Sequence, residues 1–363
     1  MHRRRFVNMV VDSTSSAGDH RAYALHRINV ADLFHRGRGR CQHAADDMET
    51  EDAVLPQPAM VLRPAGAGSD GDVEFLPLAG SDDGEAVAIN SNGRAMLCAA
   101  AARTVHVLPD LRGLAGRFTR RPFSLTVGDG LYVIDREWLS SAAPGRGSFQ
   151  VLTGGGGSAV DLRRRLPAGT LWQWRTLPPP PWATGGRGHS WSIEACAVVG
   201  GSEIWVTVAE GHDETYSFDS ATGAWRKVGD WALPFMGRAE YVPEHGLWFG
   251  LSSASGGWDS DRLLTVHASD LTPGGDVWKW QGLAVSSDEL SAEHEDSYLV
   301  PLGQRRLCVA RFEEDYDDGM CVMLSGVEVV RDTGAKCGLR MLLHRAKRYT
   351  LLGKVSRRFC RVF

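Results

Sequence analysis

The sequence predicts an all-β fold, and three observations support this class. A hairpin pattern recurs along the chain, glycines mark its turns at intervals that suit four-stranded units, and several strands are apolar on both faces. The composition is that of a folded globular chain, since 43% of the 363 residues are hydrophobic and 23% are charged. This length permits one large β-domain or two smaller ones, so the repeats decide the organisation.

The recurring unit is an apolar run, a glycine-containing turn and a second apolar run. Its turn glycines are 37, 71, 45 and 57 residues apart, which fits one four-stranded unit per interval with loops of variable length. The five copies cover residues 86–98, 123–135, 195–208, 238–250 and 298–310, with turn glycines Gly93, Gly130, Gly201, Gly246 and Gly303. The 71-residue interval contains stretches rich in glycine and proline, so we interpret it as one unit with inserted loops.

Strands that are apolar on both faces need a neighbouring sheet on each side. Residues 204–208 and 307–310 have this character, which stacked blades of a β-propeller would satisfy. Small residues suit the crowded strands nearest the propeller axis, namely Ala86, Ala88, Ala195, Ala197 and Ala310. We therefore predict that residues 1–363 form a single β-propeller of about six four-stranded blades; two adjacent β-domains are the alternative.

The chain ends are expected to close the ring, because a closed sheet array leaves no exposed edge. Residues 6–11 and 23–30 read as two strands, and 338–343 and 348–352 as two more, which together would complete a sixth blade. Polar or glycine-rich composition predicts mobile loops over 35–58 and 64–72. The basic segment 354–363 leaves the last strand undecided.

The third copy carries the sharpest local pattern. It has Gly200-Gly201 at its turn and then an aromatic residue, Asp219, Thr222 and Trp225, which resembles a kelch repeat. We expect Asp219 and Thr222 to hydrogen-bond within the hairpin of the outer strands, Gly223 to relax the turn, and Trp225 to pack between blades. A weaker echo covers residues 267–278, and Trp205, Trp248 and Trp278 are likewise interpreted as packing residues.

Features near both ends carry a wider resemblance. They are the stretch 3–12, Tyr23 to Ile28 followed by Leu33-Phe34, and Leu339 to His344 with Tyr349. With these features the chain resembles, over almost its full length, a plant family best known from grasses and catalogued as domain of unknown function 1668. The resemblance implies a kelch-like propeller with no assigned activity.

Charge and cysteine usage indicate the class of partner and the compartment. The net charge of -4 gives no reason to expect nucleic acid as a partner, although residues 333–363 hold nine Lys or Arg and no acid. The seven cysteines lack a framework spacing, and Cys196 and Cys308 lie in apolar runs. Neither a signal peptide nor a membrane span is evident. We expect a monomer in the cytoplasm or nucleus that binds another protein, without a cofactor.

Motifs for metal or phosphate chemistry are incomplete, so we predict no metal site and no catalytic residue. His294 lacks a second histidine four residues on, and the acidic run 313–319 fails the ligand spacing of a calcium loop. The glycines from Gly154 to Gly157 lack the ending of a phosphate loop and are interpreted as a flexible loop. Cys41 and His43 have no third partner in their segment.

The sequence therefore favours a non-enzymatic protein-interaction scaffold that uses loops at the propeller mouth, although the binding residues stay unknown. The alternative is a hydrolase or glycan-active enzyme with carboxylates in the central channel, to which Asp288, Glu293 and His294 would contribute. A third hypothesis assigns binding of an anionic partner to the basic C-terminal segment.

Overall fold

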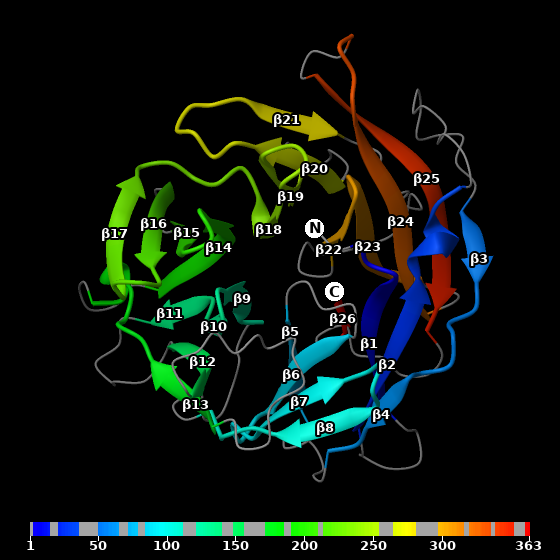
Figure 1. Cartoon of the computed structure of the whole chain (residues 1–363), viewed down its shortest axis with the longest axis horizontal. Coiled ribbons are helices and arrows are strands. Elements are labelled where there is room, and N and C mark those ends of the chain that lie inside the picture. Colours follow the sequence, from blue (N-terminus) through cyan, green and yellow to red (C-terminus); the bar gives the residue numbers. More distant parts are fainter. Residues whose placement is uncertain are drawn as a thin grey trace. The chain divides into compact units, whose positions relative to one another are not determined.

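The structure is a computed structural model, and it forms two compact units, residues 1–63 with 234–363 and residues 64–233. Within the described part, the chain consists of β-strands and two one-turn 3-10 segments, η1 (Val30–Leu33) and η4 (Pro181–Thr184), with no α-helix (Figure 1). The described residues are 3–14, 21–35, 50–64, 72–78, 84–111, 121–139, 148–155, 171–184, 190–209, 213–253, 264–280, 297–315, 319–334, 338–351 and 360–363.

The first unit contains three sheets (Figure 1). One has the order β26 (Arg361–Val362), β1 (Phe6–Thr14), β2 (Arg21–Asn29) and β4 (Met60–Leu62). Another consists of β18 (Met236–Val242), β19 (Leu247–Ser253), β20 (Leu264–Ser269) and β21 (Val277–Trp280). The third has β22 (Ser297–Gly303), β23 (Arg306–Asp315), β24 (Gly319–Arg331), β25 (Leu339–Thr350) and, in parallel with β25, β3 (Glu51–Ala53).

The second unit also holds three sheets, each an antiparallel meander. They are β5 (Val73–Pro77), β6 (Glu85–Asn90), β7 (Ala95–Ala99) and β8 (Thr104–Val107); β9 (Phe123–Val127), β10 (Gly130–Ile134), β12 (Phe149–Gly155) and β13 (Leu171–Thr176); and β14 (Ser190–Val199), β15 (Glu203–Ala209), β16 (Asp213–Asp219) and β17 (Ala224–Gly229). β11 (Glu137–Leu139) adds to β14. All five predicted hairpins are present, as β6–β7, β9–β10, β14–β15, β18–β19 and β22–β23.

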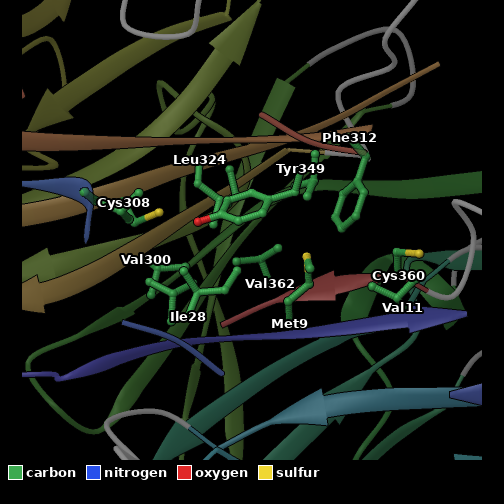
Figure 2. Close-up of a cluster of buried hydrophobic side chains, with 14 of the residues drawn as sticks. Met9, Val11, Ile28, Val300, Cys308, Phe312, Leu324, Tyr349, Cys360 and Val362 are labelled. Atoms are coloured by element: carbon green, nitrogen blue, oxygen red, sulfur yellow. The ribbon is translucent and has the colours of Figure 1, made fainter. Parts of the chain in front are cut away.

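In each unit the middle sheet is buried on both faces. On β23, Cys308 and Phe312 pack against the sheet of β1, and Figure 2 shows them with Met9 and Val362, whereas Leu307 packs on the opposite face against the sheet of β19. β10 in the second unit alternates in the same way between two apolar clusters. The five alanines predicted for crowded strands are fully buried, and so are Cys196 and Cys308, as expected. Two-sided burial therefore explains the doubly apolar strands.

The two chain ends pair in one sheet, as predicted, but through a different strand. Met9 is opposite Val362, and Asn8 and Phe363 exchange two backbone hydrogen bonds of 2.8 and 2.9 Å. The prediction that 338–343 and 348–352 form two strands of this sheet is wrong. Residues 339–350 form one continuous strand, β25, which pairs with β24 across a bulge at Gly326. The strand beside β1 comes instead from the end of the basic segment, where Cys360 to Phe363 are buried.

Two segments predicted as loops contain strands. Residues 51–53 form β3 although 35–58 was predicted to be mobile, because the acidic side chains of β3 meet basic ones on β25. Gly154 and Gly155 belong to β12, opposite Trp172 and Leu171. Residues 36–49, 65–71 and 156–157 lie outside the described ranges.

The kelch-like hairpin of β16 and β17 has the predicted contacts. The carboxylate of Asp219 accepts hydrogen bonds from the backbone N–H of Ala221 and the hydroxyl of Thr222, both at 2.9 Å, and Gly223 has a φ of 73° that favours glycine. The indole of Trp225 donates a 3.0 Å hydrogen bond to the carbonyl of Pro178, which follows the outermost strand of the preceding sheet.

The same arrangement occurs one sheet earlier. The indole of Trp174 on β13 donates a 2.9 Å hydrogen bond to the carbonyl of Pro109, which follows β8. In the echo at 267–278, Asp270 accepts from the N–H of Thr272 at 2.9 Å, and Trp278 packs against the cluster between the sheets of β19 and β23. Trp205 and Trp248 instead contact Trp231 and Tyr241, so packing between blades stays a prediction for these two.

We expect Trp225→Phe to lower the free energy of unfolding by about 1 kcal/mol, because the aromatic packing is kept while the hydrogen bond to Pro178 is lost. Urea unfolding of the full chain measures this change. Trp172→Phe serves as the control, because among the described residues no group accepts a hydrogen bond from its buried indole N–H. An equal loss in both variants would contradict a specific role of the indole bond.

Removal of residues 360–363 should lower the free energy of unfolding by about 2–4 kcal/mol, since β1 loses its partner strand and the cluster in Figure 2 loses Cys360 and Val362. Thermal unfolding followed by circular dichroism is the measurement. The control is Val54→Ala, at a side chain that is 92% exposed. An unchanged midpoint after the truncation would show that β26 does not stabilise the fold.

Candidate functional site

An acid junction lies in the second unit between β10, β11 and β14; we define it as Asp135, Arg136, Glu137 and Glu194. Asp135 directly follows the buried strand β10, and its carboxylate accepts a 2.8 Å hydrogen bond from the N–H of Ser148. The guanidinium of Arg136 donates to the carbonyl of Ile193 at 3.2 Å and lies 3.9 Å from the carboxylate of Glu194. Two sheets thus contribute charged groups to one place.

Burial dominates the electrostatics of Asp135. Loss of solvent raises the pKa of its carboxyl to about 7, with the backbone N–H of Ser148 opposing this shift and the negative charge of Glu137 adding to it. A carboxyl with this pKa is partly protonated near neutral pH. Groups of this kind occur at catalytic sites and also in structural networks. The acid junction can therefore hold or release a proton at physiological pH.

Sequence reasoning did not select Asp135, although it ended the second predicted copy. The signal was available in the sequence, where an acid follows the apolar run Leu131 to Ile134 without an intervening turn residue. The pKa of Asp135 depends on burial and on Ser148, which is 13 residues away in sequence and is brought near by the pairing of β10 with β12.

A second polar cluster surrounds His344 in the first unit, where the connection after β2 meets β24 and β25. His344 is buried, its Nε2 lies 3.2 Å from the carboxylate of Glu328, and its ring centroid lies 4.9 Å from that of Phe34. Burial lowers the pKa of His344, and Glu328 opposes that shift. Gly326 provides the space for the close approach of Leu33. These contacts fix the segment 30–35, and the residues that carry the sequence resemblance meet here.

The outermost strand β8 is an exposed edge of its sheet. The side chains of Val105 and Val107 are 45% and 90% exposed. The N–H of Leu108 donates to the carbonyl of Ala95 on β7, so strand alternation turns the backbone groups of Val105 and Val107 away from β7. Within the described ranges, β7 is the only strand that pairs with β8. This edge can accept a further strand or an apolar side chain.

The candidates chosen from sequence are mostly outside the described residues. Asp288, Glu293 and His294 fall in 281–296, and Cys41 and His43 fall in 36–49. The acidic run 313–319 spans the turn between β23 and β24, with Asp315 opposite Gly319, in agreement with an acidic hairpin tip. The structure thus neither brings the proposed channel carboxylates together nor separates them.

No group of three or more His, Cys, Asp or Glu side chains among the described residues is placed to hold a metal ion. In the same residues, no helix is long and apolar enough to cross a bilayer.

We expect Asp135→Asn to change how stability depends on pH. Because the pKa of Asp135 is higher in the folded chain than in the unfolded one, its contribution to stability is present below pH 4 and is lost as pH rises through 7. At pH 8 the variant should be more stable by on the order of 2 kcal/mol, and at pH 4 it should show no gain. Urea unfolding at several pH values measures this, with the exposed Asp129→Asn as control. A gain that is independent of pH would rule out titration of Asp135 as its cause.

Comparison with solved structures gives distant similarities. A chain in the structure of a nidogen/laminin complex matches 96% of this chain. The match covers 100% of that other chain, at 7% identity and a TM-score of 0.41. The WD40 domain of SCAP from fission yeast is similar over 97% and 89%, at 8% identity and a TM-score of 0.35. BamB from Moraxella catarrhalis is similar over 86% and 100%, at 11% identity and 0.32. At these TM-scores the similarity is too slight to assign a fold or an activity.

Sequence comparison is more decisive. No curated protein matches the chain. Residues 4–349, however, match a family described as "Protein of unknown function (DUF1668)", in agreement with the resemblance noted from the terminal motifs. This match covers far more than half of the sequence, and the chain therefore belongs to the DUF1668 family.

Proposed function

We propose that this protein is a protein-interaction scaffold, built on one β-propeller of six kelch-like blades that spans both units. Six antiparallel groups of four strands, two of them extended by β3 or β11, support the blade number, and the pairing of β26 with β1 supports closure by the chain ends. The hydrogen bonds of Asp219 and Trp225 support the kelch-like type. Loops at the propeller mouth and the edge strand β8 would contact the partner.

The observation that carries the binding role is the exposure of β8. Natural sheets guard an edge strand with lysine, proline or a covering segment, because an open edge pairs with other chains. β8 has no lysine or proline within Thr104–Val107 and presents two valines to solvent. An exposed apolar edge of this kind is typical of a surface that another protein covers.

Carboxylate chemistry remains the alternative function, and the acid junction is the observation that favours it. Asp135 supplies a proton donor near neutral pH, and the negative charge of Glu137 acts on it. A glycan-active enzyme needs two such carboxyls on opposite sides of a substrate. Asp135→Asn would abolish any hydrolysis by this site while leaving the binding of a protein partner to β8 unchanged.

A reducing compartment, cytoplasm or nucleus, suits the described cysteines. No disulfide joins these five buried residues, and burial raises the pKa of the Cys98 and Cys308 thiols to about 12. Thiols with so little thiolate resist oxidation and act as packing residues.

The scaffold proposal predicts that Val105→Lys combined with Val107→Lys reduces recovery of bound protein at least about fivefold, because lysines block strand addition at an edge. Quantitative affinity capture with mass spectrometry compares this variant with the unaltered chain. Val61→Lys is the matched control, since Val61 is also exposed and lies on β4, the outermost strand of another sheet. Equal recovery by all three chains would refute the role of β8, and the lack of any reproducible partner would refute the scaffold itself.

A further inference from the structure

β25 is a basic outer strand, with Arg340, Arg345, Lys347 and Arg348 among its twelve residues. It pairs with β24 along its length, so only its other edge is available to a further strand. In the described part of the chain, β3 pairs with that edge only at Lys347, Arg348 and Tyr349. Along residues 341–346 of β25, no described strand pairs with this outer edge.

The short strand that covers this edge is acidic and comes from far away in the sequence. Glu51 is opposite Lys347, and Asp52 is opposite Arg348, in a parallel register. The carboxylate of Glu51 lies 3.8 Å from both the guanidinium of Arg345 and the ammonium of Lys347. β25 therefore already binds one extended acidic segment, and its charges match those of that segment.

The contact between β3 and β25 is weak by its geometry. It involves three residues, parallel pairing is slightly less stable per residue than antiparallel pairing, and ion pairs of 3.8 Å at half-exposed side chains contribute little. Glu51 is still 48% exposed and Val54 just beyond it is 92% exposed. A longer acidic strand could replace β3 and extend pairing over the rest of β25.

We propose that the outer edge of β25 is a docking site for an extended acidic segment of a partner protein, and that β3 occupies this site as a replaceable internal cover. Specificity comes from backbone pairing in the direction of β3 and from carboxylates opposite Arg345, Lys347 and Arg348. The inference deepens the scaffold proposal by naming a partner class. It uses a strand of the first unit, so it can fail while binding through β8 stands.

The test uses the full chain and a fluorescein-labelled peptide with the sequence of residues 45–53, Ala-Asp-Asp-Met-Glu-Thr-Glu-Asp-Ala, which in the register of β3 reaches from residue 341 to residue 349 of β25. Glu51→Lys combined with Asp52→Lys should detach β3. A lysine at position 51 would face Arg345 and Lys347, and a lysine at position 52 would be opposite Arg348. Fluorescence anisotropy should show that this opened variant binds the peptide at least about fivefold more tightly than the unaltered chain. Adding Arg345→Glu and Lys347→Glu to the opened variant should weaken binding at least about tenfold.

Arg94→Glu combined with Arg103→Glu, in the opened variant, is the control, because this pair makes the same charge change at exposed positions of the other unit. It should leave peptide affinity unchanged. Equal binding of a scrambled peptide with the same charge would overturn strand pairing, and no binding by the opened variant would overturn the docking site.

Hydrogen exchange of the unaltered chain provides a measurement that does not depend on a variant. Excess peptide should increase exchange at the amides of Glu51 to Ala53, since the peptide displaces β3, while the amides of Lys347 to Tyr349 stay protected. Unchanged exchange in β3 at saturating peptide would contradict the inference.

Discussion

Coverage of both faces of each middle sheet is the constraint on which the rest of the structure depends. A strand such as β23 alternates between two apolar clusters, so it cannot face water on either side. Each such sheet needs two neighbouring sheets, and stacking continues until something else covers the last face.

Polar residues fix how the stacked sheets are connected. Asp219 and Asp270 satisfy backbone N–H groups in hairpins of outer strands, so these turns keep their shape without help from a core. The indoles of Trp174 and Trp225 then bind carbonyls that follow the outermost strand of the preceding sheet. Apolar packing supplies most of the stabilisation, whereas these directional bonds set the spacing between neighbouring sheets.

Local features of the fold could be predicted from the sequence, and long-range ones could not. Gly93 and Gly246 mark real turns because positive φ values favour glycine there, and Asp219 and Trp225 have the contacts that the kelch pattern predicts. β3 and β26 were missed, since strands of two or three residues have no detectable periodicity. The acid junction was missed as well, because the pKa of Asp135 depends on burial, which the sequence does not display.

The pairing of β1 with β26 has a consequence for how the chain is made. Val362 is synthesised about 350 residues after Met9, so β1 lacks this partner strand while the intervening chain is made. At typical synthesis rates of about 5–20 residues per second, the outer backbone groups of β1 would wait for tens of seconds. Contacts of such sequence separation slow folding, and an unpaired strand edge invites association with other nascent chains.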